Sequence, residues 1–600
     1  MIASTEDALA LVRSAPTILA AIEAFPLVGA AAAADGDAVR VLGSALSDVD
    51  PLVALAAVHA AADAGPDAAS LLLPLLTGEA PLLREHAAWA LASAPRLPDA
   101  VPLLAALASA GGFEGTLAEA TLEEWGDLPP DPDVEPGPPS APTPGLTIAQ
   151  LFLHSEIDGS LRHAGQGDTG GLATLLVHLG DALLAQPGIG RVLTLSRAAE
   201  DADADESAVE LARPGHHYAG VPLPRPVPPA AQSWPLRRPT RQGIRRWLVR
   251  AGHVDVLHLR MADVGSWAAA QVARELGIPV VLTLAPDPHA LIASRETAGT
   301  LTRASFGDAD LAEHLIFRVR LLRELREQAS AMVVFPRPDL ARDLRDLLHL
   351  DLDDPAEHVR VVAEGIDVEA LALAQADASS PALDELDTLL ATLPPERRDL
   401  PLVLSVGRLH RVKGMATVVR AWASDLSARA NLLVVGGDLA HPSTDEAGQL
   451  ALIDAVVPLA DAPGRGLLLA GHRPNATVAS WLAAVGGGRP RLAAPGGVYA
   501  CASLKEEFGI ALVEALGSGL VVVAPDTGGP ATYVEDGVTG VLVDTADADA
   551  LAGAVASALD LAAAPDADER AAHARDMVAE RFSIHTMAAA LATLYQEVAP

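Results

Sequence analysis

Two cations near the middle of the chain stand in a pattern that suits a phosphate-containing ligand. The apolar run PLVLSV (401–406) is followed by Gly407-Arg408 and, a few residues later, by Lys413-Gly414. On the loop after a buried strand, a guanidinium and an ammonium at this spacing can converge on a diphosphate. The pattern GxxxxGK[ST] is absent, so the loop is not a P-loop. The alternative for an isolated Arg and Lys is a solvated turn.

Lysine is scarce in this chain, and both of its positions fall in or beside the motifs discussed here. Only Lys413 and Lys505 occur among the 42 basic residues, and all the others are arginine. A chain that uses arginine wherever either cation suffices keeps lysine where a compact ammonium is needed. This usage favours a ligand-binding role for Lys413.

A second motif combines two glutamates with the start of a predicted helix. Glu506 lies before a helix that begins near Gly509, and Glu514 lies on its second turn. The backbone amides of Phe508, Gly509 and Ile510 would point at a phosphate, as helix N-termini do. Carboxylates accept paired hydrogen bonds from hydroxyls, so the glutamates suit a sugar and a ribose. Compensation of the helix dipole and a solvated helix position are the alternative.

A glycine-rich stretch near the start of the α/β region has two interpretations. GQGDTG (165–170) formally matches the dinucleotide-binding pattern GxGxxG. The preceding strand, however, ends near Leu153, and the second strand has no acidic residue at its end, which argues against an NAD site. The remaining interpretation is a loop of Asp168, Gly170 and Gly171 that opens a helix and lets backbone amides approach a substrate.

Apolar runs alternate with helical stretches from residue 147 onward, which predicts parallel strands buried on both faces. The runs form two sets separated by an acidic stretch at about 370–400. We therefore expect two doubly wound, Rossmann-like α/β domains with a ligand cleft between them. The first set is 148–153, 191–195, 255–259, 279–284, 331–335 and 359–363, and the second is 401–406, 431–436, 466–470, 497–502, 520–524 and 540–544.

The chain before residue 127 is rich in alanine and leucine at helical spacing. Segments 50–65, 80–95 and 113–126 resemble one another, and the first two begin 30 residues apart. This recurrence suits stacked helix pairs similar to HEAT repeats, and an alanine-rich bundle is the alternative. Eight prolines in 127–146 predict an extended linker that holds this module at a distance. The expected domains are 1–126 (helical repeats), 127–146 (linker), 147–385 and 386–575 (α/β), and 576–600 (a helix returning to the first α/β domain).

The composition excludes several classes of function. The 600 residues carry a formal net charge of −36, which disfavours nucleic acids and anionic lipid. Cys501 is the sole cysteine, which excludes an intramolecular disulfide or a cysteine-rich zinc site. No long uncharged run suggests a membrane span, and Glu6 and Asp7 do not suit a signal peptide, so we expect a cytoplasmic protein.

In combination, these motifs resemble the retaining glycosyltransferases of family four, which have the two-domain GT-B fold. The resemblance covers 147–600, about three quarters of the chain. Stretches 434–446 and 262–265 are similar to the sucrose-phosphate synthase and sucrose synthase branch, and DTGG (168–171) is similar to that branch and to the mycothiol-pathway enzyme. The motifs that carry the resemblance are Gly407-Arg408, Lys413-Gly414, Glu506, Glu514, 526–530 (DTGGP), 535–540 (EDGVTG) and the closing helix 581–595.

The resemblance implies a role for each residue of the donor half. Arg408 and Lys413 would bind the donor diphosphate and stabilise it as it leaves. Glu506, with the amides of 508–510, would hold the donor sugar and its phosphate, and Glu514 would bind the ribose hydroxyls.

The resemblance also implies the co-substrate. The donor would be a UDP-, GDP- or ADP-sugar, which Gly170 and Gly171 would face from the first domain. No metal would be required, because cations and a helix N-terminus take its place. The acidic run Asp201, Asp203 and Asp205 is a formal metal motif, but its hydrophilic surroundings favour a solvated loop.

The acceptor half departs from the family pattern. Ala285 stands where the family has a histidine, and Met261 replaces the usual aromatic residue. Asp263 and His289, with Asp168, are the candidate acceptor-side residues. We therefore do not infer a sucrose-type acceptor.

The acceptor and the oligomeric state stay open, and so does a second class of function. The helical module is predicted to recruit the acceptor, with a protein or peptide as one candidate. A stabilising role for the module is the alternative. A non-catalytic scaffold with a vestigial glycosyltransferase fold is the alternative function.

Overall fold

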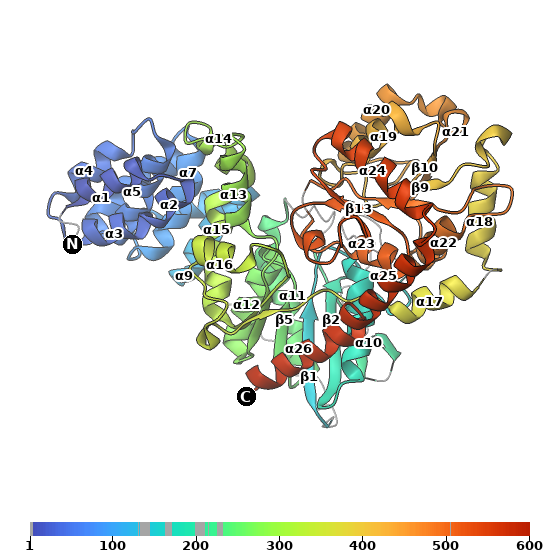
Figure 1. Cartoon of the computed structure of the whole chain (residues 1–600). Helices are drawn as coiled ribbons and strands as arrows, with labels where there is room; N and C mark the ends of the chain where they lie inside the picture. Colours follow the sequence, from blue (N-terminus) through green and yellow to red (C-terminus); the bar gives the residue numbers. More distant parts are fainter. Residues whose placement is uncertain are drawn as a thin grey trace.

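Figure 1 shows the chain as a computed structural model, in which an N-terminal helical module is followed by two α/β domains. The structure describes residues 4–129, 131, 144–161, 171–198, 210–213, 215–224, 232–377, 379–504 and 506–600. Most of the predicted linker lies outside the described residues. So do Asp168, Gly170, Lys505 and the acidic run Asp201, Asp203 and Asp205.

The N-terminal module is entirely helical, as predicted. The three similar segments form α5, α7 and α9, which pack against one another in that order. Hydrogen bonds join Ser93 to Asp63 (2.9 Å) and Arg84 to Glu114 (2.6 Å), 30 residues apart in each case. The 30-residue recurrence therefore corresponds to helices that stack on one another. The HEAT-like assignment remains a prediction. The helices are α1 (Thr5–Ser14), α2 (Ile18–Glu23), α3 (Phe25–Ala34), α4 (Ala38–Ala45), α5 (Pro51–Asp63), α6 (Pro66–Ala69), α7 (Pro81–Ala90), α8 (Val101–Ala110) and α9 (Gly112–Glu124).

The module is not held at a distance, contrary to the expectation from the linker. It packs directly on the first α/β domain, beside α13 (Pro288–Thr297), α14 (Phe306–Glu313) and α15 (Leu315–Gln328) (Figure 1). Phe317 on α15 is 3% exposed, and its ring lies 5.2 Å from that of Trp89 and 5.1 Å from that of Phe113, both in the module. The module and one face of the first sheet therefore share a single apolar core.

A buried polar chain reinforces this interface. His59 Nε2 and His86 Nδ1 are 2.9 Å apart, and His86 Nε2 lies 2.7 Å from the carboxylate of Asp310 on α14. The other oxygen of Asp310 accepts a hydrogen bond from the amide of Ile316 (2.7 Å). Burial lowers the pKa of His59 well below its usual value, with the charges of Arg320 and His86 acting in the same direction.

Over the described residues, the first α/β domain is built on an eight-stranded sheet in the order β3-β4-β2-β1-β5-β6-β7-β8. All neighbouring strands are parallel except β3 and β4, which pair in antiparallel fashion. The sequence did not predict these two strands. Its strands are β1 (Leu146–Leu151), β2 (Ile189–Arg197), β3 (Glu210–Arg213), β4 (His216–Val221), β5 (Val256–Leu259), β6 (Val280–Thr283), β7 (Ala329–Val334) and β8 (Val359–Val361). Its helices are α10 (Leu172–Leu184), α11 (Arg237–Ala251), α12 (Val264–Leu276), α13 (Pro288–Thr297), α14 (Phe306–Glu313), α15 (Leu315–Gln328) and α16 (Leu340–Leu348).

The second α/β domain has a six-stranded parallel sheet in the order β11-β10-β9-β12-β13-β14, and each predicted strand is present. Helices α17 and α18 pack on α22 of this domain, so the first domain ends after β8, upstream of the expected boundary at 385. The strands are β9 (Leu402–Val406), β10 (Asn431–Val435), β11 (Leu467–Gly471), β12 (Val498–Ala500), β13 (Val522–Pro525) and β14 (Gly540–Val543). The helices are α17 (Val368–Ala376), α18 (Pro381–Leu390), α19 (Met415–Ala421), α20 (Thr444–Val456), α21 (Ala462–Arg465), α22 (Asn475–Gly487), α23 (Ile510–Gly517), α24 (Ala548–Ala562), α25 (Ala567–Arg581) and α26 (Ile584–Val598).

The chain crosses between the α/β domains twice, and the two crossings are hydrogen-bonded to each other. Ile366 donates to Phe582 O and accepts from Ile584 N, both at 2.8 Å. After the second crossing, α26 packs on α10 of the first domain, and Tyr595 Oη lies 2.6 Å from His258 Nδ1 (Figure 1).

Within the described residues, no single helix has the length and apolar character needed to cross a membrane. The successive helices α24 and α25 reach that length and composition only as a pair bent by 105°.

Removing residues 1–126 should abolish soluble expression, because it would expose the buried face of α15 around Phe317. Soluble yield and the melting temperature of the truncated protein check this outcome. A soluble truncated protein that keeps its activity on the donor and loses transfer to the acceptor would instead support recruitment by the module.

Asp310→Ala tests the interface between the module and the first α/β domain in the full-length chain. Removing one partner of a buried pair should cost about 3 kcal/mol of stability. Asp560→Ala, which breaks the exposed pair with Arg429, is the control and should change stability by less than about 1 kcal/mol.

Candidate active site

The predicted motifs lie at the points where the strand order of each sheet reverses. In the first sheet this point lies between β1 and β5, and in the second between β9 and β12. Ligands of open α/β sheets bind beyond the carboxyl ends of the strands there. Lys413 follows β9, Glu506 follows β12, and Gly171 precedes the helix after β1. The fold thus places three separate stretches of sequence at one junction between the domains.

Lys413 and Glu506 form one unit. Lys413 Nζ donates to Glu506 Oε2 at 2.7 Å, and Ser503 Oγ donates to the same oxygen at 2.8 Å. The carboxylate of Glu506 is largely buried, whereas the Lys413 side chain is 28% exposed. A cation and a carboxylate, each with remaining hydrogen-bonding capacity, therefore lie side by side.

Glycine allows the Lys413 loop to approach the Glu506 loop this closely. Gly414 has φ +65°, and a Cβ there would lie 2.0 Å from Ala502 O. The amide of Leu504 also donates to Val412 O at 2.8 Å. Arg408 lies two residues beyond β9 on the same loop and is half-buried.

The DTGGP motif supports the Glu506 loop from behind. Gly528 has φ +73°, and a Cβ there would lie 2.2 Å from Glu506 O, while Gly529 donates its amide to that oxygen at 3.2 Å. The Phe508 ring is buried between Tyr533 and Phe582, so Phe508 offers the cleft its backbone and not its side chain.

The starts of two helices from different domains meet at the junction between the domains. Gly171 is the N-cap of α10, and Gly509, with φ +96°, is the N-cap of α23. A Cβ at Gly171 would contact Ile510 Cδ1 at 3.5 Å. The positive ends of both helix dipoles therefore lie at the same inter-domain junction.

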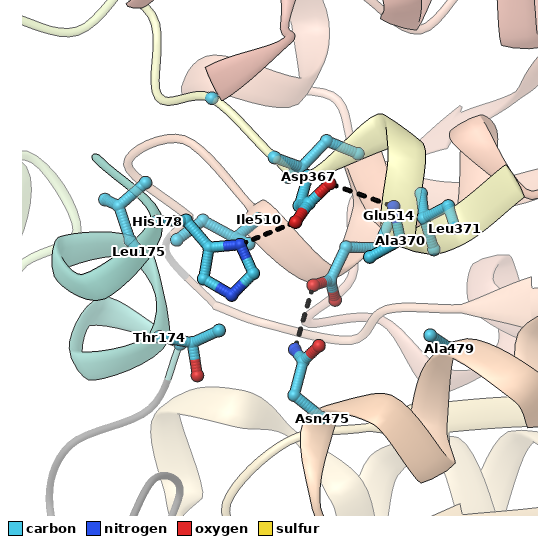
Figure 2. A pocket seen from close by; sticks show the side chains of 13 residues that line it. Thr174, Leu175, His178, Asp367, Ala370, Leu371, Asn475, Ala479, Ile510 and Glu514 are labelled. Atoms are coloured by element: carbon cyan, nitrogen blue, oxygen red, sulfur yellow. Dashed lines mark hydrogen bonds and ion pairs between the residues drawn. The ribbon is translucent and has the colours of Figure 1, made fainter. Parts of the chain in front are cut away.

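A pocket opens beside this junction, and Figure 2 shows the side chains that line it. Glu514 accepts from Asn475 Nδ2 at 3.1 Å, and burial raises its pKa although Asn475 and His178 act against the rise. His178 on α10 lies 2.8 Å through Nδ1 from Asp367, and that hydrogen bond lowers the pKa of Asp367. The lining residues are Gly171, Thr174, Leu175, His178, Gly365, Ile366, Asp367, Ala370, Leu371, Asn475, Ala479, Ile510 and Glu514.

A second charged pair lies close to Lys413 and Glu506. Arg260, after β5, is 2% exposed, and its Nη2 lies 3.9 Å from Glu364 on the first crossing. Burial raises the pKa of Glu364 to about 7; Arg260 and Lys413 oppose this rise and Glu506 adds to it. Sequence reasoning missed Arg260 and Glu364, which follow strands, and Asp367, which caps α17. It also missed His178, which lies within α10 and has no such positional signal.

Asp263 and His289, two of the acceptor-side candidates, make contacts within the first α/β domain. Asp263 caps α12 by accepting from Ser266 N at 2.7 Å, and it also lies 2.5 Å from His154 Nε2, which the sequence did not single out. Burial alone would raise the pKa of Asp263, but these contacts lower it overall. His289 is buried rather than on the surface, and its Nδ1 lies 3.3 Å from Asp287.

The family models match both α/β domains. Residues 169–370 match the model described as Glycosyltransferase Family 4, and residues 400–560 match the model described as Glycosyl transferases group 1. This chain is a glycosyltransferase. The helical module lies outside both matched ranges.

The curated relatives of this glycosyltransferase include two kinds of enzyme. It is 27% identical over 439 residues to the D-inositol 3-phosphate glycosyltransferase of Nocardioides sp., covering 69% of this chain and 82% of that protein. It is 31% identical over 175 residues to the sucrose synthase of Acidithiobacillus caldus, covering 28% of this chain. The match spans 21% of that sucrose synthase, about a fifth of its length.

Solved structures share the fold of this glycosyltransferase at low identity, as the GT-B prediction requires. Sucrose-phosphate synthase from Thermosynechococcus elongatus superposes with a TM-score of 0.56 at 21% identity, over 75% of this chain and 98% of that one. Trehalose 6-phosphate synthase from Burkholderia multivorans gives a TM-score of 0.52 at 16% identity, over 76% and 98%. HepE of Anabaena, solved with UDP and glucose, gives 0.50 at 17%, over 75% and 100%.

The raised pKa of Glu364 predicts a pH-dependent loss of stability. The pKa of Glu364 in the folded protein, about 7, exceeds the usual 4.5, so the folded state favours the protonated carboxyl. Its contribution to the free energy of unfolding is therefore fully present below pH 4.5 and is lost as the pH rises through 7. Glu364→Gln cannot ionise, so its stability relative to wild type should rise between pH 5 and 8, by up to about 3 kcal/mol. Melting temperatures across this range check the prediction.

The control is Glu79→Gln, which removes an exposed carboxylate on the helical module. Its pH profile should run parallel to that of the wild type. Parallel profiles for Glu364→Gln and the wild type would contradict the assignment.

Proposed function

We propose that this glycosyltransferase moves a sugar from a nucleoside diphosphate sugar to an acceptor with retention of the anomeric configuration. The observation that carries the proposal is the convergence, at one inter-domain junction, of the Lys413–Glu506 pair, two helix N-termini and a pocket that contains Glu514. Cations and helix dipoles favour a diphosphate, and carboxylates favour hydroxyl groups. A nucleoside diphosphate sugar presents both.

The residue roles follow from this chemistry. Arg408 and Lys413 hold the diphosphate and stabilise the negative charge that develops on it as the sugar leaves. Glu506, next to Lys413, accepts hydrogen bonds from the sugar, and the amides at the start of α23 face the phosphate. Glu514, one turn into α23, binds the ribose.

The nucleotide is the finer part of the proposal. UDP is the first candidate to test, because HepE of Anabaena, which shares the fold, was solved in complex with UDP and glucose. GDP- and ADP-sugars complete the set to be tested.

The acceptor binds on the side of the first α/β domain, where Asp263, His154 and His289 lie near the carboxyl ends of the strands. Ala285 at the end of β6 offers no side-chain hydrogen bond there, so a sucrose-type acceptor is not part of the proposal. The extensive contact between the helical module and α15 favours a stabilising role for that module over recruitment.

Arg408→Ala or Lys413→Ala should lower turnover of the preferred nucleotide sugar by about 100- to 1000-fold. Turnover is measured as hydrolysis of UDP-, GDP- and ADP-sugars by the purified chain. Release of the nucleoside diphosphate serves as the readout. Arg411→Ala, an exposed residue on the same loop, is the matched control. Near-normal turnover in both variants would remove the diphosphate assignment, and no hydrolysis by the wild type would favour a scaffold.

Glu514→Gln should weaken binding of the free nucleoside diphosphate, whereas Glu506→Gln should mainly lower turnover of the sugar-bearing donor. The reason is position, since Glu514 lies inside the pocket and Glu506 at the Lys413 loop. Calorimetric titration and steady-state kinetics separate the two effects. Equal losses of free-nucleotide affinity would contradict the division of roles.

Donor turnover should survive EDTA, because the proposed site supplies positive charge at the diphosphate from Arg408, Lys413 and α23. The measurement is the rate of donor hydrolysis before and after chelation. Loss of activity that added Mn²⁺ or Mg²⁺ restores would point instead to the acidic run Asp201, Asp203 and Asp205.

A further inference from the structure

One face of α10 lines the pocket that contains Glu514. Gly171, Thr174, Leu175 and His178 follow the spacing i, i+3, i+4, i+7 and so lie on a single side of the helix. Among the described residues that line the pocket, the polar side chains of the first domain are Thr174 and His178. The others come from the crossing segment (Asp367) and from the second domain (Asn475 and Glu514). Figure 2 shows its imidazole and the Glu514 carboxylate directed into the same space.

The orientation of His178 is fixed by the crossing segment. Its Nδ1 lies 2.8 Å from Asp367 Oδ2. The other oxygen of Asp367 accepts from Ala370 N at 2.9 Å as the N-cap of α17, so the carboxylate itself is held in place. An imidazole held through Nδ1 presents its Nε2 in a defined direction.

The second nitrogen of His178 is available to a ligand. Within the described part of the chain, Nε2 forms no hydrogen bond, and the side chain keeps 26% of its surface exposed. Glu514 has one oxygen bonded to Asn475 at 3.1 Å. The pocket therefore offers an imidazole nitrogen on one side and a carboxylate oxygen on the other.

We infer that His178 binds a ribose hydroxyl of the nucleotide from the first domain, opposite Glu514. A hydroxyl can donate to a neutral Nε2 or accept from a protonated one, so it suits either state of the imidazole. The ribose then bridges the two domains, and nucleotide binding itself draws them together. This inference rests on the proposed function and adds to it a nucleotide-binding residue from the first domain.

The test compares ribose with its deoxy forms. UDP, ADP and GDP are titrated calorimetrically, and the nucleotide that binds is then compared with its 2′-deoxy and 3′-deoxy forms. For the wild type, removing the hydroxyl that His178 binds should weaken affinity about 10-fold. His178→Ala should bind the parent nucleotide about 10-fold more weakly and should lose that discrimination, so that the parent and one deoxy form bind equally. His178→Leu, which keeps bulk in the pocket, should behave the same way.

The matched control is His253→Ala. His253 Nε2 also pairs with an aspartate, Asp255, at 2.8 Å, but its side chain is 78% exposed and lies before β5, at the opposite edge of the sheet. This variant should bind all ligands as the wild type does.

Two results would overturn the inference alone. An equal loss of affinity for the parent nucleotide and both deoxy forms would mean that His178 only holds the domains together through Asp367. Unchanged affinity in His178→Ala would mean that it does not contact the nucleotide. Failure of the wild type to bind UDP, ADP and GDP would overturn the proposed function itself, and this inference with it.

Discussion

The geometry of the cleft depends on the hydrogen bonds between the two segments that cross from one α/β domain to the other. Ile366 on the first crossing pairs with Phe582 and Ile584 on the second, so the two connections form a single strip of backbone. From this strip α26 runs back over α10 and places Tyr595 against His258. Two chain crossings that are bonded to each other constrain the domains more than one linker could.

The site holds its charges as pairs rather than as a positive patch. The chain as a whole carries −36, yet Lys413 contacts Glu506 and Arg260 lies near Glu364 in the same region. A paired cation costs less to hold in a partly buried cleft than an isolated one does. An anionic ligand must therefore share Lys413 with Glu506, and a sugar hydroxyl next to the phosphate can bind the carboxylate at the same time. This arrangement favours a ligand that carries both groups over a bare phosphate.

The helical module belongs to the same structural unit as the first α/β domain. The aromatic ring of Phe317 and the carboxylate of Asp310 both reach into the module, one through packing and one through the chain of His86 and His59. A sheet needs cover on both faces, and α10 and α26 supply it on one side. On the other side, α12 packs on α15, and Trp89 and Phe113 of the module cover α15 at Phe317, which explains why the module and this face share one core.

The sequence determined the elements and the donor-side motifs, because both depend on local pattern. Continuous apolar runs specify buried parallel strands, and all but β3 and β4 were predicted; β4 carries polar residues such as His216 and Tyr218 that break the run. The Lys413 and Glu506 loops could be placed near each other because both follow strands at one sheet edge. Tertiary structure alone decided what depends on contacts between distant segments. His178 and Asp367 are 189 residues apart and lack a local motif, and they meet only because the crossings fix α10 against α17. The packing of the helical module likewise could not be predicted from the sequence, because an apolar helix face does not specify which surface will pack against it.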